Sequence, residues 1–404
     1  MSLIPLSAGF LPLLDSVLLV LAREKGFAAA EGLDLRLVRE TSWANVRDRA
    51  ALGHFDFAQM LAPMPLAATL GLTPLAVPMI APMVLGLGNN GVTVSAALWQ
   101  QMAEAGAPAT LEAGPVGAAL ARVVKSSDRR LRFAVVHQSS SHNYELRYWL
   151  SASGIVPDRD VDIVVLPPPY LPDALGSGGI DGYCVGEPWN SVGVEQEGAH
   201  IATVKASIWR NSPDKVIGMR AAWAAANSEL VAALIRAVHK AAVFCSVAGN
   251  HDEVARIMSA PQYLGVEPER ILPGLSGRFA IGGGVTAEVP DAFVPYERAA
   301  NFPWTSHALW FYSQMVRWGE VGHSPLRAEI AALTFRPDIY RAALAPLKVA
   351  VPLADSRVEG SLQAPAAVPG TQGSVTIGPD GFFDGKVFDP AAIDTYIASQ
   401  APSL

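Results

Sequence analysis

Short apolar runs alternate along the chain with longer segments in which apolar residues recur every three or four positions. The first pattern is typical of buried β-strands and the second of amphipathic helices, so their alternation indicates βαβ units around a largely parallel sheet. We therefore expect an α/β protein. The predicted strands cover residues 3–6, 34–38, 55–59, 75–85, 92–94, 132–136, 161–166 and 182–185. The predicted helices cover residues 11–25, 43–52, 96–105, 142–153, 188–197 and 227–247, with a looser helical region at 304–318.

The apolar segment at residues 3–22 is similar to a signal peptide in composition alone. No Lys or Arg precedes it, Asp15 interrupts it, and no small-residue cleavage site follows. It is short for a membrane span, and it runs into residues 23–26, whose basic side chains and final glycine are typical of a helix C-terminus. We expect a short strand and an amphipathic helix here, in a soluble cytoplasmic protein.

Composition narrows the classes of function. Of the 404 residues, 50% are hydrophobic and 17% are charged, which excludes a disordered chain. The formal net charge of −7 disfavours general nucleic-acid binding, because phosphate contacts need an excess of Lys and Arg. Two cysteines, Cys184 and Cys245, are too few for a disulfide scaffold or a Cys-rich metal site. The chain contains none of the motifs of phosphate-binding loops, dinucleotide-binding folds, zinc proteases or serine hydrolases.

A candidate anion site lies where the strand at residues 34–38 gives way to a helix. Ser42 is a good N-cap residue, and the free backbone N–H groups of a first helical turn attract anions. Trp43 adds an indole N–H, which can only donate a hydrogen bond. This junction favours a ligand that accepts hydrogen bonds.

Several longer motifs then point to a family. They lie at residues 42–48, 59–65, 142–149, 185–190, 213–218, 306–311 and 382–390. Together they resemble the nitrate- and bicarbonate-binding subunits of ABC importers, over almost the whole chain. The resemblance implies a two-lobed, type II periplasmic-binding-protein (Venus-flytrap) fold with a C-terminal extension. Lobe one would comprise residues 1–92 and 200–351, lobe two residues 93–199, and a C-terminal wrapping arm residues 352–404.

The missing leader makes the chain similar to the cytoplasmic nitrate/nitrite sensors of this family, the NasS type. By that resemblance, it would sequester a NasT-type RNA-binding transcription antiterminator and release it when the anion binds. We expect no catalytic activity, no cofactor, and no direct contact with nucleic acid or membrane. One alternative is the receptor of a nitrate or bicarbonate ABC importer with its leader removed. Another is an enzyme of thiamin-precursor synthesis, which shares this fold class but for which the chain has no motif.

Nitrate is planar, singly charged and offers only acceptors, so its pocket should present donors and a cation in a cleft that excludes water. By position, the resemblance assigns the anion contacts to Trp43, Gln59, Asn89, Asn90, His137, Gly186 and Lys215. His137 ends a predicted strand, where the ligand crevice of an α/β sheet opens. Lys215 is expected in the loop before residues 216–218.

Glu187 leaves open the alternative that the bound anion is bicarbonate. Bicarbonate-binding members of the family resemble this chain at that position, where they use a glutamate together with bound calcium. Calcium takes about six to eight oxygen ligands, and the sequence places no acidic cluster near Glu187. We expect no metal, unless Glu187 belongs to a calcium-bicarbonate site.

Overall fold

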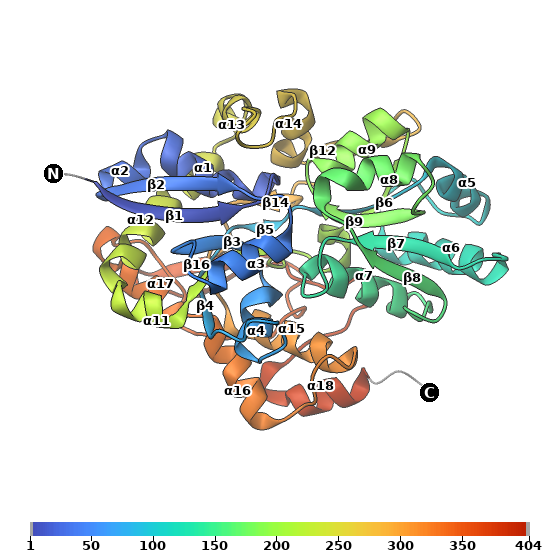
Figure 1. Cartoon of the computed structure of the whole chain (residues 1–404). Helices are drawn as coiled ribbons and strands as arrows, with labels where there is room; N and C mark the ends of the chain where they lie inside the picture. Colours follow the sequence, from blue (N-terminus) through green and yellow to red (C-terminus); the bar gives the residue numbers. More distant parts are fainter. Residues whose placement is uncertain (1–2, 401–404) are drawn as a thin grey trace.

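The structure is a computed structural model that describes residues 3–400. It forms two lobes, each built on a five-stranded sheet with helices packed against it (Figure 1). The strand order is β2-β1-β3-β11-β4 in the first sheet and β10-β6-β9-β7-β8 in the second. The predicted two-lobed α/β architecture is confirmed.

The first sheet contains β1 (Ile4–Phe10), β2 (Leu33–Arg39), β3 (Phe57–Leu61), β4 (Met79–Val84) and β11 (Lys215–Arg220). The second contains β6 (Asn90–Val94), β7 (Leu131–Val135), β8 (Val161–Val165), β9 (Gly182–Gly186) and β10 (His200–Val204). The expectation of largely parallel sheets is confirmed for four of the five strands in each sheet, and one strand in each sheet runs in the opposite direction. β11 runs antiparallel to β3 and β4, and β6 runs antiparallel to β9 and β10, because both strands follow a passage of the chain from one lobe to the other.

The passages between the lobes also correct a predicted boundary. A return to lobe one at residue 200 would place β10 in the first sheet. It pairs instead with β6 in the second sheet, and the chain returns to the first sheet only at β11. The small strands β5 (Leu87–Gly88) and β14 (Phe293–Val294) pair with each other where the chain first crosses between the lobes.

The predicted helices occur close to their expected bounds, except that the helix predicted at residues 11–25 begins only at Val17, after a short 3-10 turn. Around the first sheet lie α1 (Val17–Glu24), α2 (Phe27–Ala30), α3 (Trp43–Ala51), α4 (Pro63–Thr69), α11 (Ala221–Ala226), α12 (Ser228–Cys245), α13 (His251–Met258), α15 (Thr305–Arg317), α16 (Pro325–Thr334) and α17 (Pro337–Leu344). The remaining helices are α5 (Ala96–Glu104), α6 (Ala113–Ser126), α7 (Ser141–Ala152), α8 (Leu171–Gly176), α9 (Trp189–Glu197), α10 (Lys205–Ile208), α14 (Pro268–Ser276) and α18 (Ile393–Ser399).

Helix α12 shows how the apolar pattern builds the core of lobe one. Its stripe of Leu234, Val238 and Ala242 is fully buried in the cluster that also contains α1, as helical spacing predicts. Among the residues that the structure describes, no single helix is long and apolar enough to cross a membrane. One pair bent by 92°, Ser228–Cys245 with Ala248–Met258, meets that test by length and composition alone.

The C-terminal segment contacts both lobes. It first forms the hairpin β15 (Ala366–Pro369) and β16 (Ser374–Ile377), against the apolar core of lobe one. Phe382 then stacks on Trp209, with ring centroids 4.8 Å apart, and Tyr148 of α7 donates a hydrogen bond to Asp384 at 2.9 Å. Helix α18 packs on α15. The arm therefore ties α7, a helix of lobe two, to helices of lobe one.

Candidate functional site

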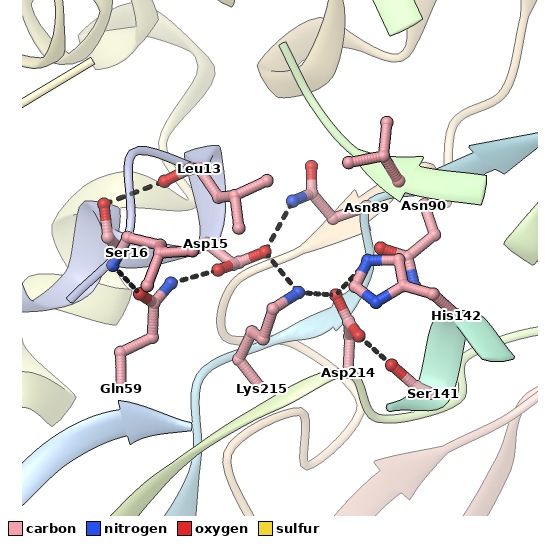
Figure 2. A network of polar contacts seen from close by, with 12 residues as sticks. Leu13, Asp15, Ser16, Gln59, Asn89, Asn90, Ser141, His142, Asp214 and Lys215 are labelled. Atoms are coloured by element: carbon pink, nitrogen blue, oxygen red, sulfur yellow. Dashed lines mark hydrogen bonds and ion pairs between the residues drawn. The ribbon is translucent and has the colours of Figure 1, made fainter. Parts of the chain in front are cut away.

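Three of the side chains predicted to bind an anion converge on one internal carboxylate, that of Asp15 (Figure 2). Asn89 Nδ2 donates to Asp15 Oδ2 at 2.9 Å, and Lys215 Nζ lies 3.0 Å from the same oxygen. Gln59 Nε2 donates to Asp15 Oδ1. All four side chains are buried. The predicted donors are therefore brought together, but around a group of the protein itself.

Local structure fixes these groups in place. Asp15 lies in a short 3-10 turn, Leu14–Ser16, which directly precedes α1 and is closed by a bond from Ser16 Oγ to the Leu13 carbonyl at 2.8 Å. Gln59 Oε1 accepts from the backbone N–H of Leu11 at 2.8 Å, so its amide nitrogen must face Asp15. Lys215 is the first residue of β11 and is paired with β3, which corrects the prediction that it lies in a loop.

Asp214 joins this cluster to lobe two. One of its oxygens pairs with Lys215 Nζ, and the other accepts a hydrogen bond from Ser141 Oγ. His142 Nε2 lies 4.0 Å from Asp214. Ser141 and His142 begin α7, so these contacts hold the lobes together.

A second buried ion pair lies beside the first. Lys205 Nζ pairs with Glu145 Oε1 and also donates to the Pro213 carbonyl at 2.8 Å. Asn90 Nδ2 lies 3.5 Å from Glu145 Oε2. Together the two groups contain three carboxylates (Asp15, Asp214 and Glu145) and two ammonium groups (Lys215 and Lys205). The cluster therefore carries one surplus negative charge when every group is ionised.

Burial and the neighbouring charges shift the pKa values of the groups in this cluster. Burial raises the pKa of Asp15 above its ordinary value, even though Lys215 opposes this shift. For Asp214, burial acts in the same upward sense, but the charge of Lys215 prevails and holds its pKa below the ordinary value. Burial raises the pKa of Glu145 to about 7 and lowers that of His142 to about 3. His142 is therefore neutral near pH 7, and Asp15 and Glu145 are the groups most ready to take up a proton.

Several buried polar atoms at the site have no partner within residues 3–400. They are the indole Nε1 of Trp43, both ring nitrogens of His142, and Oδ1 of Asn89 and of Asn90. Trp43 begins α3 after the predicted N-cap Ser42, whose Oγ accepts from Asn45 N at 3.2 Å, and its ring lies 5.7 Å from Lys215 Nζ. Buried donors are seldom left unsatisfied in proteins. The indole N–H and the single N–H of neutral His142 could both serve a bound acceptor.

Gly186 lies beside the two asparagines. It ends β9 opposite Asn90 of β6, and a Cβ atom at this position would lie 3.2 Å from Asn89 Nδ2 and 3.2 Å from Leu13 Cδ2. Its lack of a side chain therefore leaves room for the Asn89 amide.

His137 is the predicted residue that stands apart. Its Nδ1 accepts from the backbone N–H of Ser139 at 3.0 Å, and its Nε2 lies 3.5 Å from Arg47 of α3. Burial, with the charge of Arg47, lowers its pKa to about 4. In the part of the chain that the structure describes, no hydrogen bond links His137 to Asp15 or Lys215.

Glu187 makes its polar contacts with a neighbouring serine. Its carboxylate accepts from Ser191 Oγ at 2.8 Å and from Ser191 N at 3.2 Å, and burial raises its pKa to about 7. Over the described range 3–400, no three His, Cys, Asp or Glu side chains are grouped to hold a metal ion.

The sequence pattern does not reveal the acidic partners of the site. Along the chain, Asp15 is only an interruption of an apolar segment, and His142 is only a residue suited to the start of a helix. The signal that could have found the acids is position: Asp15 and Glu145 are charged residues within buried segments, where an unpaired charge is costly.

The fold and the buried polar site between its lobes define a two-lobed solute-binding protein. The chain belongs to the NMT1-like family, whose model matches residues 4–259. A nitrate/nitrite binding protein, NrtA, from Synechococcus elongatus is 32% identical over 400 residues, which cover 96% of this chain and 84% of that protein. The nitrate import ATP-binding protein NrtC from Synechocystis is 37% identical over 342 residues, 83% of this chain; the match spans only 49% of that longer protein.

A solved structure extends the similarity to three dimensions. The crystal structure of the periplasmic nitrate-binding protein NrtA from Synechocystis matches with a TM-score of 0.86 and 28% sequence identity, and 98% of each chain is covered. Both NrtA relatives are solute-binding proteins.

Proposed function

We propose that this protein binds nitrate or nitrite between its two lobes. The observation that carries the proposal is the convergence of Gln59, Asn89 and Lys215 on the carboxylate of Asp15. A carboxylate is planar, singly charged and rich in acceptors, as nitrate is. A set of donors that holds a carboxylate is therefore chemically suited to hold nitrate. The similarity to nitrate/nitrite binding proteins supports the same ligand.

Binding requires that the site open, because its side chains are sealed from solvent. Opening separates Ser141 from Asp214, which breaks the direct side-chain bond between α7 and the residue that precedes β11. The incoming anion then competes with Asp15 for Lys215 and Asn89, while Trp43 and His142 offer N–H groups that Asp15 does not use. Protonation of Asp15 would lower its hold on these donors and remove the surplus negative charge.

We further propose that the protein is a cytoplasmic sensor, which holds a NasT-type RNA-binding antiterminator and releases it on anion binding. This finer proposal rests on the resemblance of the sequence motifs. A ligand shifts a conformational equilibrium only by its different affinity for the two states. The partner must therefore prefer the anion-free state, and by linkage it must weaken anion binding by the same factor.

A thermal-shift titration tests the ligand. Nitrate, nitrite, bicarbonate with calcium, and sulfate are added separately to the full chain. A ligand at about a hundredfold over its dissociation constant should add roughly 2.7 kcal/mol of stability. Stabilisation by nitrate or nitrite alone supports the proposal. Stabilisation by bicarbonate and calcium alone would assign the site to that anion instead.

A second experiment separates the sensor from an importer receptor. The purified protein is mixed with a two-domain RNA-binding antiterminator, and the complex is followed by size-exclusion chromatography with and without nitrate. The sensor should form a complex that nitrate dissociates. The absence of a complex under both conditions, with nitrate binding intact, would favour the receptor.

A further inference from the structure

A cavity of about 300 Å³ lies in lobe one, apart from the Asp15 cluster. It is lined by residues of α12, the segment 296–302, α17 and the C-terminal segment around β16. Of these elements, α12 and α17 pack against each other in lobe one (Figure 1). None of the described residues that line it belongs to the anion site. Its volume is at the lower end of the range for small-molecule sites, which suits a ligand with a single ring.

The walls of this cavity are aromatic. Tyr296 meets His239 edge to face with ring centroids 5.4 Å apart, and Phe302 meets Tyr340 in the same way at 5.8 Å. Phe302 and Tyr340 are buried, whereas Tyr296 is half-buried. Rings arranged in this way present faces and edges to a planar guest.

Two buried polar atoms among the lining residues are unsatisfied by anything in residues 3–400. Asn301 donates from Nδ2 to the carbonyls of Val84 and Pro295, each at 3.0 Å, and this fixes its amide. Its Oδ1 is left without a donor, and Nδ1 of His239 also has no partner. The exposed fractions of Asn301 and His239 are 2% and 6%. An unmade hydrogen bond at a buried group costs about 1–3 kcal/mol, so a ligand that donates to Asn301 would recover part of this cost.

The backbone that forms one wall is strained. Arg298 and Ala299 have φ values of 60° and 57°, in the left-handed region that residues with a side chain seldom adopt twice in succession. Such strain collects at ligand sites more often than elsewhere.

The charges at the cavity disfavour an anion. Arg298 is the one cationic lining residue among those described, and its guanidinium is already held by Asp291 at 2.6 Å and Asn211 at 3.1 Å. The other charged lining residue, Glu297, is an exposed carboxylate. Burial lowers the pKa of His239 to about 4, so its imidazole is neutral near pH 7.

We propose that this cavity is a second binding site, for a planar single-ring compound that carries an N–H donor and no negative charge. The ring packs between Tyr296, Phe302 and Tyr340. The N–H group donates to Oδ1 of Asn301, and the side chains that cover this atom move aside on binding, because Oδ1 is buried in the unliganded protein. This site is independent of the proposed nitrate site and takes a ligand of the opposite chemistry, because it offers an acceptor where the Asp15 cluster offers donors.

Three matched probes test the proposal on the full chain: benzamide, benzamidine and benzoate, which share the ring and differ in donor groups and charge. Binding is followed by saturation-transfer NMR and by titration. Benzamide and benzamidine should bind, and benzoate should bind at least about tenfold more weakly, a difference of about 1.4 kcal/mol. Equal binding of benzoate, or no binding of the other two, would overturn the proposal.

Substitutions locate the bound probe. Ala350 is an exposed lining residue, so Ala350→Trp should block the cavity without disturbing the core. Ala354→Trp is the control, at an exposed position four residues further along the chain and outside the lining. Tyr296→Ala removes a wall and should weaken benzamide binding about tenfold, whereas Tyr170→Ala, at an exposed tyrosine elsewhere, should not. Benzamide binding that survives both Ala350→Trp and Tyr296→Ala would place the probe elsewhere and overturn the assignment.

Discussion

Asp15 and Lys215 form an ion pair of 3.0 Å that is sealed from solvent, and Asp214 contacts the same ammonium group. One lysine is thus shared by two carboxylates. An external anion that needs Lys215 must displace an internal competitor. The affinity and the pH dependence of the site should therefore depend on Asp15 as much as on the donors.

Replacing Asp15 by asparagine should strengthen nitrate binding at neutral pH. The change removes the competing charge while keeping a side chain of the same shape. In the wild type, burial raises the pKa of Asp15, so lower pH neutralises it and affinity should rise by up to about tenfold per pH unit if one proton is taken up with each anion. Titrations at four pH values between 5.5 and 8.5 should show this slope in the wild type and a flat profile in Asp15→Asn. Glu145→Gln, at the other carboxylate with a raised pKa, is the control that shows whether Glu145 supplies part of the slope.

Replacing Lys215 by methionine should abolish nitrate binding and also destabilise the fold. It leaves Asp15 and Asp214 buried without their cation, and breaking a buried ion pair in this way costs about 3–5 kcal/mol. The double variant Lys215→Met with Asp15→Asn should recover much of the stability in urea unfolding but none of the binding. Nitrate affinity retained in the double variant would remove Lys215 from the site.

His137 stands apart from the Asp15 cluster, and only the sequence resemblance assigns it to the anion site. On that assignment, His137→Gln should lower nitrate affinity about three- to tenfold, the loss of one hydrogen bond, without altering its pH profile. With a pKa of about 4, His137 is neutral from pH 5 to 8. Since Nδ1 accepts from the backbone N–H of Ser139, the proton of the neutral ring lies on Nε2, which faces Arg47 at 3.5 Å. Isothermal titration at pH 5.5 and 7.5 gives both affinities. Unchanged affinity at both pH values would assign His137 a structural role beside Arg47.

Glu187→Gln should flatten the dependence of stability on pH. Burial raises the pKa of Glu187 to about 7, so its protonated form favours the folded state. That contribution is complete below about pH 4.5 and is lost as pH rises through about 7; each pH unit between these values removes roughly 1.4 kcal/mol. Urea unfolding of the wild type should therefore show falling stability across this window, and the variant should show a smaller fall, because Glu145, whose pKa burial also raises to about 7, still contributes. Glu229→Gln, at an exposed glutamate, should behave as the wild type.

The sequence predicts those elements whose burial follows a simple period. Helices α3, α7, α12 and α15 begin and end within two residues of their predicted bounds, because each has a clear N-terminal signal or apolar stripe. Helix α6 is not predicted, because Gly114, Pro115 and Gly117 lower its helix propensity. Strands β10 and β11 are not predicted either, because their places in the sheets depend on the two passages between the lobes.

Some residues of the candidate site could likewise be predicted from the sequence, and others could not. The motifs contain Trp43, Gln59, Gly186 and Lys215, and three of the predicted donors, Gln59, Asn89 and Lys215, do lie together. Asp15 and Asp214 could not be assigned from the sequence. Asp15 is 200 residues from Lys215 along the chain, and only the fold brings the two together. Asp214 directly precedes Lys215, but the sequence does not show that the two side chains turn toward each other.

The position of β11 between β3 and β4 sets an order for assembly during synthesis. Every strand of the second sheet lies within residues 90–204, so that sheet is complete before the ribosome reaches β11. The first sheet has a gap between β3 and β4 until residue 220 has emerged. Domains fold as units while the chain is made, and here the inserted lobe can be finished while the lobe encoded first still lacks β11. Lys215, carried on that strand, is therefore among the last parts of the binding site to arrive.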